Sequence, residues 1–257
     1  MLYQTLNYQK KENVGTTSII GPLDNPVKLA RLSNELTVLC GEIAWDEEVR
    51  VVIVAGAGEI SFPTAKGSSG VVSKAKKEQT LQFSSIAEPI AKLDKPVIAA
   101  IKGNVIGQGL ELALACDMRI AEETSRFGLL HIRAGFIPWD GGTQRLSRLV
   151  GRGKALEMIL TGEIIDVQEA YQIGLVNKIV PPRELMATVM NLAREMACKG
   201  SIALRYAKEA IYKGMDLTLE QGLRLEADLY LLLHTTKDRT EGIQAFREKK
   251  TPKFEGR

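Results

Sequence analysis

The sequence is poor in the residues that hold metals and form disulfides. It contains two histidines and three cysteines in 257 residues. The cysteine count is odd and no pair has a CxxC spacing, so neither a disulfide framework nor a paired-cysteine zinc site is expected. We expect no metal and no cofactor. Cys40, Cys116 and Cys198 are predicted to be reduced, small core-type residues in a reducing compartment.

The sequence also lacks a long apolar run and an excess of one charge. No run approaches the ~18–20 residues that cross a bilayer, and the N-terminus shows no signal-peptide apolar region. The net charge is +3, with basic and acidic residues intermixed, which gives no electrostatic footprint for nucleic acid. These features predict a cytoplasmic globular protein without nucleic-acid or membrane partners.

What the chain does contain is an alternation of strand-like and helix-like segments. Short β-branched runs predict strands at Val49–Ala55, Pro96–Ile101, Cys116–Ala121 and Val176–Val180. Helical apolar spacing predicts helices at Lys28–Ile43, Lys77–Leu93, Glu184–Ala197, Ile202–Lys213 and Leu217–Leu233. We therefore expect an α/β core over residues 1–182 and a helical region over 183–257, whose apolar stripes need cover from the core or another subunit.

A glycine-rich turn joins a predicted strand to a helix at Gly107-Gln108-Gly109. Free backbone N–H groups at the start of a helix favour a phosphate or an oxyanion that forms during a reaction. The dinucleotide-binding pattern is excluded, because Leu112 stands where its third glycine belongs, and no P-loop lysine follows. A plain tight turn is the alternative.

The chain resembles the crotonase (enoyl-CoA hydratase/isomerase) superfamily over nearly its whole length. The matching segments are Lys95–Gly103, Gly107–Asp117, Gly135–Leu146, Leu160–Gly162, Gly174–Val176 and Asp238–Phe246. The resemblance implies a spiral of ββα units with a trailing C-terminal helical region that builds a trimer or a dimer of trimers. It also implies an acyl-CoA substrate, so that coenzyme A enters only as part of the substrate.

The resemblance further implies two backbone N–H groups that hold the thioester oxygen. One falls on Gln108, and the other falls on Lys66 in a loop that reads Thr64-Ala65-Lys66-Gly67 where the family has Ala-Gly-Ala-Asp. Gly109, in the same glycine turn, is expected to line the substrate pocket.

The two glutamates of the family's hydratases correspond to Glu111 and to position 131, which is His131 here. Thioester enolate chemistry needs an acid or base near the α or β carbon. Glu111 is predicted to be catalytic, with a helix N-terminal Glu stabilised by the dipole as the alternative. His131 is a catalytic candidate because its ordinary pKa permits acid–base work, and a satisfied core histidine is the alternative.

Asp140 is the third catalytic candidate. It resembles the catalytic aspartate of dienoyl-CoA isomerases, which also stands before a Gly-Thr turn, while a helix N-cap or an Asx turn is the alternative. Trp139 beside it is expected to wall the acyl pocket or to pack in the core. Near the C-terminus, Lys249, Lys250 and Phe246 are predicted to bind coenzyme A, against a solvated cluster of charges.

The expected function is reversible addition of water to an enoyl- or dienoyl-CoA through an oxyanion-stabilised enolate, with a cyclic or branched acyl group as one option. Glu111 would activate water or move the α proton, with Asp140 or His131 as the second group. One alternative is an enoyl- or dienoyl-CoA isomerase that shuttles a proton. Others are decarboxylation, C–C hydrolysis or dehalogenation with the Lys66 ammonium taking part, and a noncatalytic or RNA-binding relative.

Overall fold

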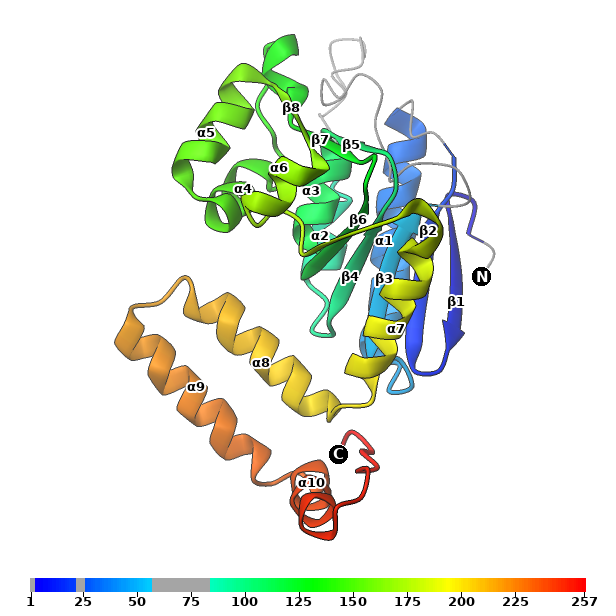
Figure 1. Ribbon diagram of the computed structural model, residues 1–257, viewed down its shortest axis with the longest axis vertical. Coiled ribbons are helices and arrows are strands. Elements are labelled where there is room, and N and C mark those ends of the chain that lie inside the picture. Colours follow the sequence, from blue (N-terminus) through cyan, green and yellow to red (C-terminus); the bar gives the residue numbers. More distant parts are fainter. Residues whose placement is uncertain (1–2, 22–25, 57–83) are drawn as a thin grey trace.

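The computed structural model describes residues 3–21, 26–56 and 84–257. Its main sheet has six strands in the order β1-β2-β3-β4-β6-β9. They are β1 (Leu6–Lys11), β2 (Val14–Ile19), β3 (Val51–Gly56), β4 (Val97–Ile101), β6 (Met118–Glu122) and β9 (Lys178–Val180). β1 and β2 form an antiparallel hairpin, and every later neighbour pairs in parallel (Figure 1).

Both faces of this sheet are covered, as a parallel sheet requires. On one face, Val52, Val54 and Ala99 share a buried cluster with α1 (Pro26–Trp45), α2 (Ala87–Ala91) and α3 (Gln108–Ala115). On the other face, Ile53 and Ile98 share a cluster with α7 (Leu185–Ala197). The alternation of side chains along each strand therefore produces two hydrophobic cores, and the predicted α/β architecture is confirmed.

A second, smaller sheet lies beside α3. It has three strands in the order β5-β7-β8: β5 (Asn104–Ile106), β7 (Arg126–Gly128) and β8 (Ile164–Asp166). The helices around it are η1 (Leu130–Ala134, a 3₁₀ helix), α4 (Gly142–Val150), α5 (Arg152–Thr161) and α6 (Val167–Gln172). A short 3₁₀ helix, η2 (Pro182–Glu184), precedes α7. This small sheet brings the chain after β7 back toward the start of α3.

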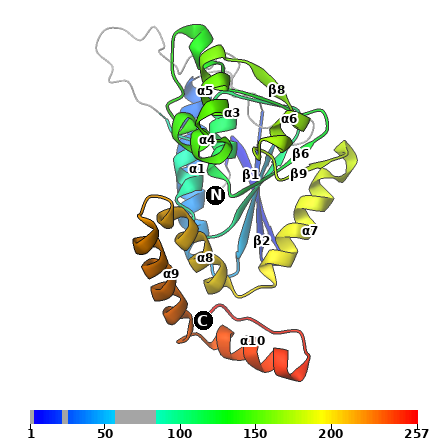
Figure 2. The ribbon, with the colours of Figure 1, turned by 60° about the vertical axis from the view of Figure 1, so that its left-hand side comes forward.

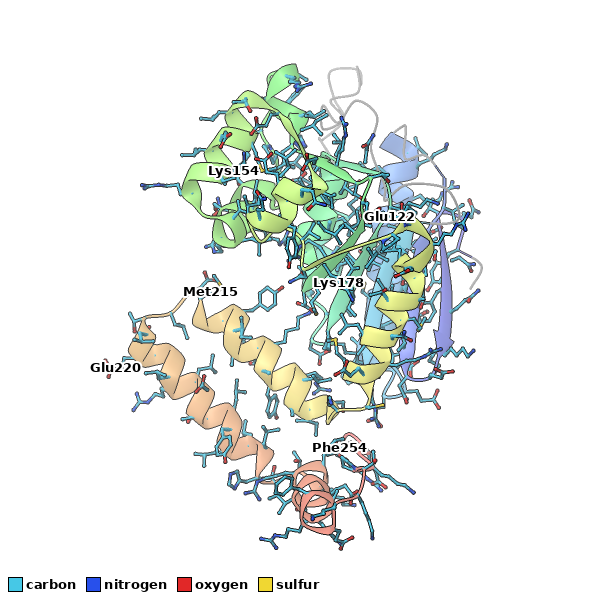
Figure 3. All side chains as sticks on the ribbon, in the orientation of Figure 1. Glu122, Lys154, Lys178, Met215, Glu220 and Phe254 are labelled. Carbon is cyan, nitrogen blue, oxygen red and sulfur yellow. The ribbon has the colours of Figure 1, made fainter. Side chains whose placement is uncertain are left out.

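The last three helices leave the α/β part. They are α8 (Ser201–Gly214), α9 (Leu219–Leu233) and α10 (Lys237–Glu248). In both ribbon views α8 and α9 run side by side as a hairpin that projects away from the sheets, with α10 at the end opposite the α8–α9 turn (Figures 1 and 2). Met215, at the exposed turn between α8 and α9, is labelled in Figure 3. Lys208 ties α8 to the core by donating to the Asp117 carboxylate, with 2.8 Å between Nζ and Oδ2.

Several sequence predictions need correction. Cys40 and Cys116 are buried and free, but Cys198 is exposed, because it lies just after the last core-facing residue of α7. Only α2 of the predicted helix Lys77–Leu93 is helical in the described residues; residues 77–83 lie outside them. The other predicted strands and helices are confirmed with their ends moved by a few residues. None of the described helices is long and apolar enough to cross a membrane.

Candidate active site

The start of α3 is shaped by a glycine that no other residue replaces easily. Gly107 has φ 60° and ψ −129°, a backbone conformation closed to side chains with a Cβ atom. Its N–H donates to the carbonyl of Gly128 in β7, with 2.9 Å between the two atoms. Gly107 thus turns the chain sharply from β5 into α3 and fixes where the helix begins.

The first residue of α3 offers an open backbone donor. The N–H of Gln108 has no acceptor among the described residues, as expected for the first turn of a helix. It lies at the positive end of the helix dipole, where a developing negative charge is stabilised. The Gln108 side chain is also buried, and its Nε2 atom has no partner in the described residues. The other predicted oxyanion donor, Lys66, lies outside the described residues.

Glu111 follows three residues later on the same helix and is fully buried. Its Oε1 atom accepts hydrogen bonds from two backbone N–H groups, that of Asp140 at 2.7 Å and that of Gly142 at 2.9 Å. Its Oε2 atom has no hydrogen-bond partner in the described part of the chain. One oxygen therefore holds the carboxyl group in place, and the other is left for chemistry.

The seat of Glu111 depends on Gly142 having no side chain. A Cβ atom at position 142 would lie 2.9 Å from Oε1 of Glu111 and 2.8 Å from Cβ of Pro138. Both distances are shorter than a Cβ atom normally keeps from any other heavy atom, so a larger residue would push the carboxylate away. The Gly141-Gly142 pair at the start of α4 is thus a part of the site.

The surroundings of Glu111 shift its proton affinity. The pKa of Glu111 is raised from 4.5 to about 7, chiefly by burial, and the nearby Asp140 charge adds to the rise while the hydrogen bond from the N–H of Gly142 opposes it. A carboxyl group with a pKa near neutrality exchanges protons readily with water and with substrate, which suits a general acid or base.

His131 lies next to Glu111, on η1. Its side chain is fully buried, and its Nε2 atom lies 3.5 Å from Oε2 of Glu111. That separation is longer than an ordinary hydrogen bond, and neither ring nitrogen has a hydrogen-bond partner in the described residues. Burial lowers the pKa of His131 to about 4, so the imidazole is neutral at neutral pH. The structure thus brings together the residues at both positions where the family's hydratases carry glutamate.

Asp140 is buried, and its carboxylate is occupied by another helix. Its Oδ2 atom accepts from the N–H groups of Ile86 and Ala87 at 2.9 and 3.1 Å, and its Oδ1 atom contacts the Ser85 hydroxyl. Asp140 therefore caps the start of α2, 53 residues away in the chain. Burial raises its pKa and these donors lower it. Its predicted acid–base role stays a prediction, and would require it to release one of these donors.

Comparisons with known proteins identify the family of this chain. The family model "Enoyl-CoA hydratase/isomerase" matches residues 11–257. The chain belongs to the enoyl-CoA hydratase/isomerase family. It is 37% identical to a short-chain-enoyl-CoA hydratase of Clostridium acetobutylicum over 98% of both chains, and 34% identical to a crotonyl-CoA hydratase of Syntrophomonas wolfei over 99% of both.

A solved structure in the same family confirms the fold. The crystal structure of an enoyl-CoA hydratase from Bacillus anthracis matches with a TM-score of 0.88 and 38% identity, covering 99% of this chain and 100% of the other. The crotonase-type architecture predicted from the sequence is therefore confirmed, and with it a family of enzymes acting on acyl-CoA thioesters.

The structure brings only some of the remaining predicted site residues close to α3. Gly109 is buried in the first turn of α3, next to Gln108. Trp139 is half-buried between Pro138 and Asp140, so its role as a pocket wall stays a prediction. Phe246 and the two lysines, Lys249 and Lys250, are exposed at the end of α10, which lies far from α3 in both views (Figures 1 and 2). Within one chain they do not meet Glu111.

Sequence reasoning missed the backbone groups that hold Glu111. The N–H groups of Asp140 and Gly142 carry no signal in their side chains, and only the Gly-Gly pair hints at a close approach. It also missed Ser85, which the fold brings to Asp140. No group of three or more metal-ligating side chains occurs in the described residues, and the absence of a cofactor stays an expectation.

Proposed function

We propose that this protein is an enoyl-CoA hydratase that adds water reversibly to the α,β double bond of an enoyl-CoA. The observation that carries the proposal is the first turn of α3. The open N–H of Gln108 and the buried carboxyl of Glu111 stand three residues apart on one helix, and Oε2 of Glu111 is not engaged by another hydrogen bond in the described residues. An oxyanion donor and a proton carrier are thus held in fixed relation.

The reaction follows from these two groups. The thioester oxygen accepts a hydrogen bond from the N–H of Gln108, and by family resemblance from the N–H of Lys66. Ionised Glu111 takes a proton from water as the water oxygen bonds to the β carbon, and the electron pair moves onto the thioester as an enolate. Glu111 then gives that proton to the α carbon. No cofactor is needed for this cycle.

The acyl group is proposed from relatives and resemblance together. The two hydratases named above act on short-chain enoyl-CoA and crotonyl-CoA by their names. Crotonyl-CoA is therefore the first substrate to test. Dienoyl-CoA and cyclic enoyl-CoA come next, because His131 replaces the usual second glutamate and the changed acid–base set favours an unusual chain.

A second candidate is isomerisation of an enoyl- or dienoyl-CoA. It is favoured by one observation: in the described residues, Glu111 is the carboxyl group at this site that keeps an oxygen without a hydrogen bond, whereas both oxygens of Asp140 are engaged. A single carboxyl group suffices to carry a proton between two carbons of the substrate, with no water added.

The deciding experiment follows the absorbance of the conjugated thioester in heavy water. A hydratase removes the conjugation of crotonyl-CoA and places solvent deuterium at the α carbon and solvent oxygen at the β carbon. An isomerase moves the double bond without incorporating oxygen.

The variant Glu111→Gln is expected to lower kcat by about 10²–10⁴-fold, while its affinity for acyl-CoA stays within several-fold of the parent's. Glu47→Gln, at an exposed turn, is the matched control. Absence of turnover with any enoyl-CoA would contradict both functions.

The assembly and the coenzyme A site are proposed together. We infer a trimer or a dimer of trimers, in which α8 and α9 contact a second copy. Lys249, Lys250 and Phe246 would then reach coenzyme A at a neighbouring subunit, since within one chain they lie far from α3. What supports this is the exposed apolar surface of α8 and α9, which includes Ile211, Leu219 and Leu231.

A further inference from the structure

The neighbour of Glu111 that the chemistry above does not use is His131. It comes from η1, whereas Glu111 comes from α3, and both side chains are fully buried. Nε2 of His131 and Oε2 of Glu111 lie 3.5 Å apart. Catalytic hydrogen bonds are often long in ligand-free proteins and shorten when substrate binds. Two buried polar atoms without another described partner therefore face each other.

Of the two ring nitrogens that can carry the proton of the neutral imidazole, one has a described acceptor nearby. A neutral histidine carries a hydrogen on either Nδ1 or Nε2. On Nδ1, that hydrogen would be a buried donor without a described acceptor, which is unfavourable. On Nε2, it points at a carboxylate oxygen. The hydrogen-bonding requirements of buried groups thus favour the Nε2–H form.

We propose that His131 is a positioning residue that donates its Nε2–H to Oε2 of Glu111 and keeps that carboxyl group ionised and ready to act as a base. The Glu111 carboxylate would then accept three N–H groups, two from the backbone of Asp140 and Gly142 and one from His131. Hydrogen bonds to the charged form of a carboxyl group stabilise that form.

The surroundings of the pair favour the protonated form of Glu111, which a hydrogen-bond donor would oppose. Burial and the Asp140 carboxylate both raise the pKa of Glu111, while Arg145, whose guanidinium donates to the Asp140 carbonyl, lowers it. Burial lowers the pKa of His131 and so favours the neutral imidazole, and the Glu111 carboxylate lies 3.5 Å from its Nε2 atom. A neutral donor offsets part of the burial cost of Glu111 without adding a second titrating charge.

The inference rests on the proposed function for its effect on rate, but its central claim needs no substrate. The carbonyl stretch of protonated Glu111 is measured by infrared difference spectroscopy against Glu111→Gln, as a function of pH, in the full-length protein. The variants are His131→Gln, His131→Asn and His131→Leu. The Gln amide nitrogen reaches the place of Nε2, whereas the Asn amide nitrogen matches Nδ1, so these two amides form a matched pair.

We expect His131→Gln to titrate Glu111 like the parent and to keep kcat within about threefold. His131→Asn and His131→Leu should leave Glu111 protonated to higher pH, with an ionised fraction roughly tenfold smaller at the same acidic pH, since one pKa unit is tenfold. The acidic limb of kcat/KM should move by the same amount. Using both Asn and Leu keeps the test decisive if one of them fails to fold.

Two results would overturn the inference. An unchanged infrared titration in His131→Asn and His131→Leu would show that His131 does not donate to Glu111. A loss of kcat in His131→Gln as large as in Glu111→Gln, with a normal infrared titration, would show that His131 carries a proton itself. If the protein turns over no enoyl-CoA, the proposed function fails while the infrared titration still decides the pairing.

Discussion

At the scale of single residues, Glu111 and His131 have pKa values that move in opposite directions. Burial raises the pKa of Glu111 from 4.5 to about 7 and lowers that of His131 from 6.5 to about 4. Between pH 4.5 and 6.5 the folded protein therefore holds a proton on Glu111 that the unfolded chain has lost, and lacks one on His131 that the unfolded chain has gained. As pH rises over this range, the contribution of Glu111 to the stability of the folded protein falls and that of His131 increases.

Removing one of the two residues should leave only the other's contribution to the pH dependence of the free energy of unfolding. Relative to the parent, Glu111→Gln should become more stable as pH rises from 4.5 to 6.5, by about 2 kcal/mol. His131→Gln should change by a similar amount in the opposite direction. The measurement is denaturant unfolding at several pH values, compared with the parent so that other titrating groups cancel. Equal slopes in both variants would contradict the opposed pKa values.

Gly142 gives a second prediction at this scale. Gly142→Ala places a Cβ atom 2.9 Å from Oε1 of Glu111, so the carboxyl group must move. We expect kcat to fall by at least ~10²-fold, because misplacing a catalytic group by about 1 Å costs that much, and stability to fall by about 1–3 kcal/mol. Gly153→Ala, at an exposed helical position with no atom within 4 Å of the added Cβ, is the control. Normal turnover in Gly142→Ala would show that the Glu111 carboxyl group tolerates the added methyl group.

At the scale of elements, Asp140 connects α2 to α3. Its side chain caps α2 and its backbone N–H holds Glu111, so one residue aligns two helices. Asp140→Asn keeps an oxygen for the N–H groups of Ile86 and Ala87, and we expect kcat within about tenfold of the parent. Asp140→Ala removes the cap and should cost about 0.5–2 kcal/mol of stability.

Turnover and thermal unfolding of both Asp140 variants separate the two roles. If Asp140→Asn loses more than about 10²-fold in kcat with an unchanged melting temperature, the acid–base role predicted from the sequence is correct. In that case the cap would have to open during the reaction.

The elements that the sequence predicted well are those with strong local patterns. α1 and α7 have one apolar face, and β3 and β4 are runs of β-branched and small residues. The β1–β2 hairpin was missed because its turn is Glu12-Asn13, with φ values of 54° and 62°, and lacks the glycine that normally marks such turns. The three-residue strands β5, β7 and β8 are too short to show a period. Residues that meet through the fold, such as Ser85 and Asp140, leave no local signal.

At the scale of the whole molecule, α8 and α9 expose more apolar surface than a separate chain would keep in water. The exposed side chains include Ile211, Met215, Leu219, Leu223, Tyr230 and Leu231. In the described residues the two helices pack mainly on each other, and Lys208 of α8 is bonded to Asp117 of the core. This supports the proposed trimer or dimer of trimers, in which these faces are covered by another copy.

Light scattering coupled to gel filtration tests the assembly. The parent should have the mass of three or six chains of 28.2 kDa. Replacing two exposed leucines, as in Leu219→Glu with Leu231→Glu, should shift the mass toward one chain, because charged groups are disfavoured in the core of an interface. Lys199→Glu, an exposed site outside these helices, should leave the mass unchanged. A parent of one-chain mass at every concentration would rule out the assembly.

The spacing on α3 has a consequence for how this kind of enzyme changes over evolutionary time. Gln108 and Glu111 stand on one helical turn, so the axial offset between them is fixed by the backbone at ~4.5 Å, from a rise of ~1.5 Å per residue. Under the proposed mechanism, this offset sets the distance between the group that polarises the thioester carbonyl and the group that carries the proton. Other segments that line the substrate pocket can change without altering this offset, so substrate range and reaction chemistry can diverge separately.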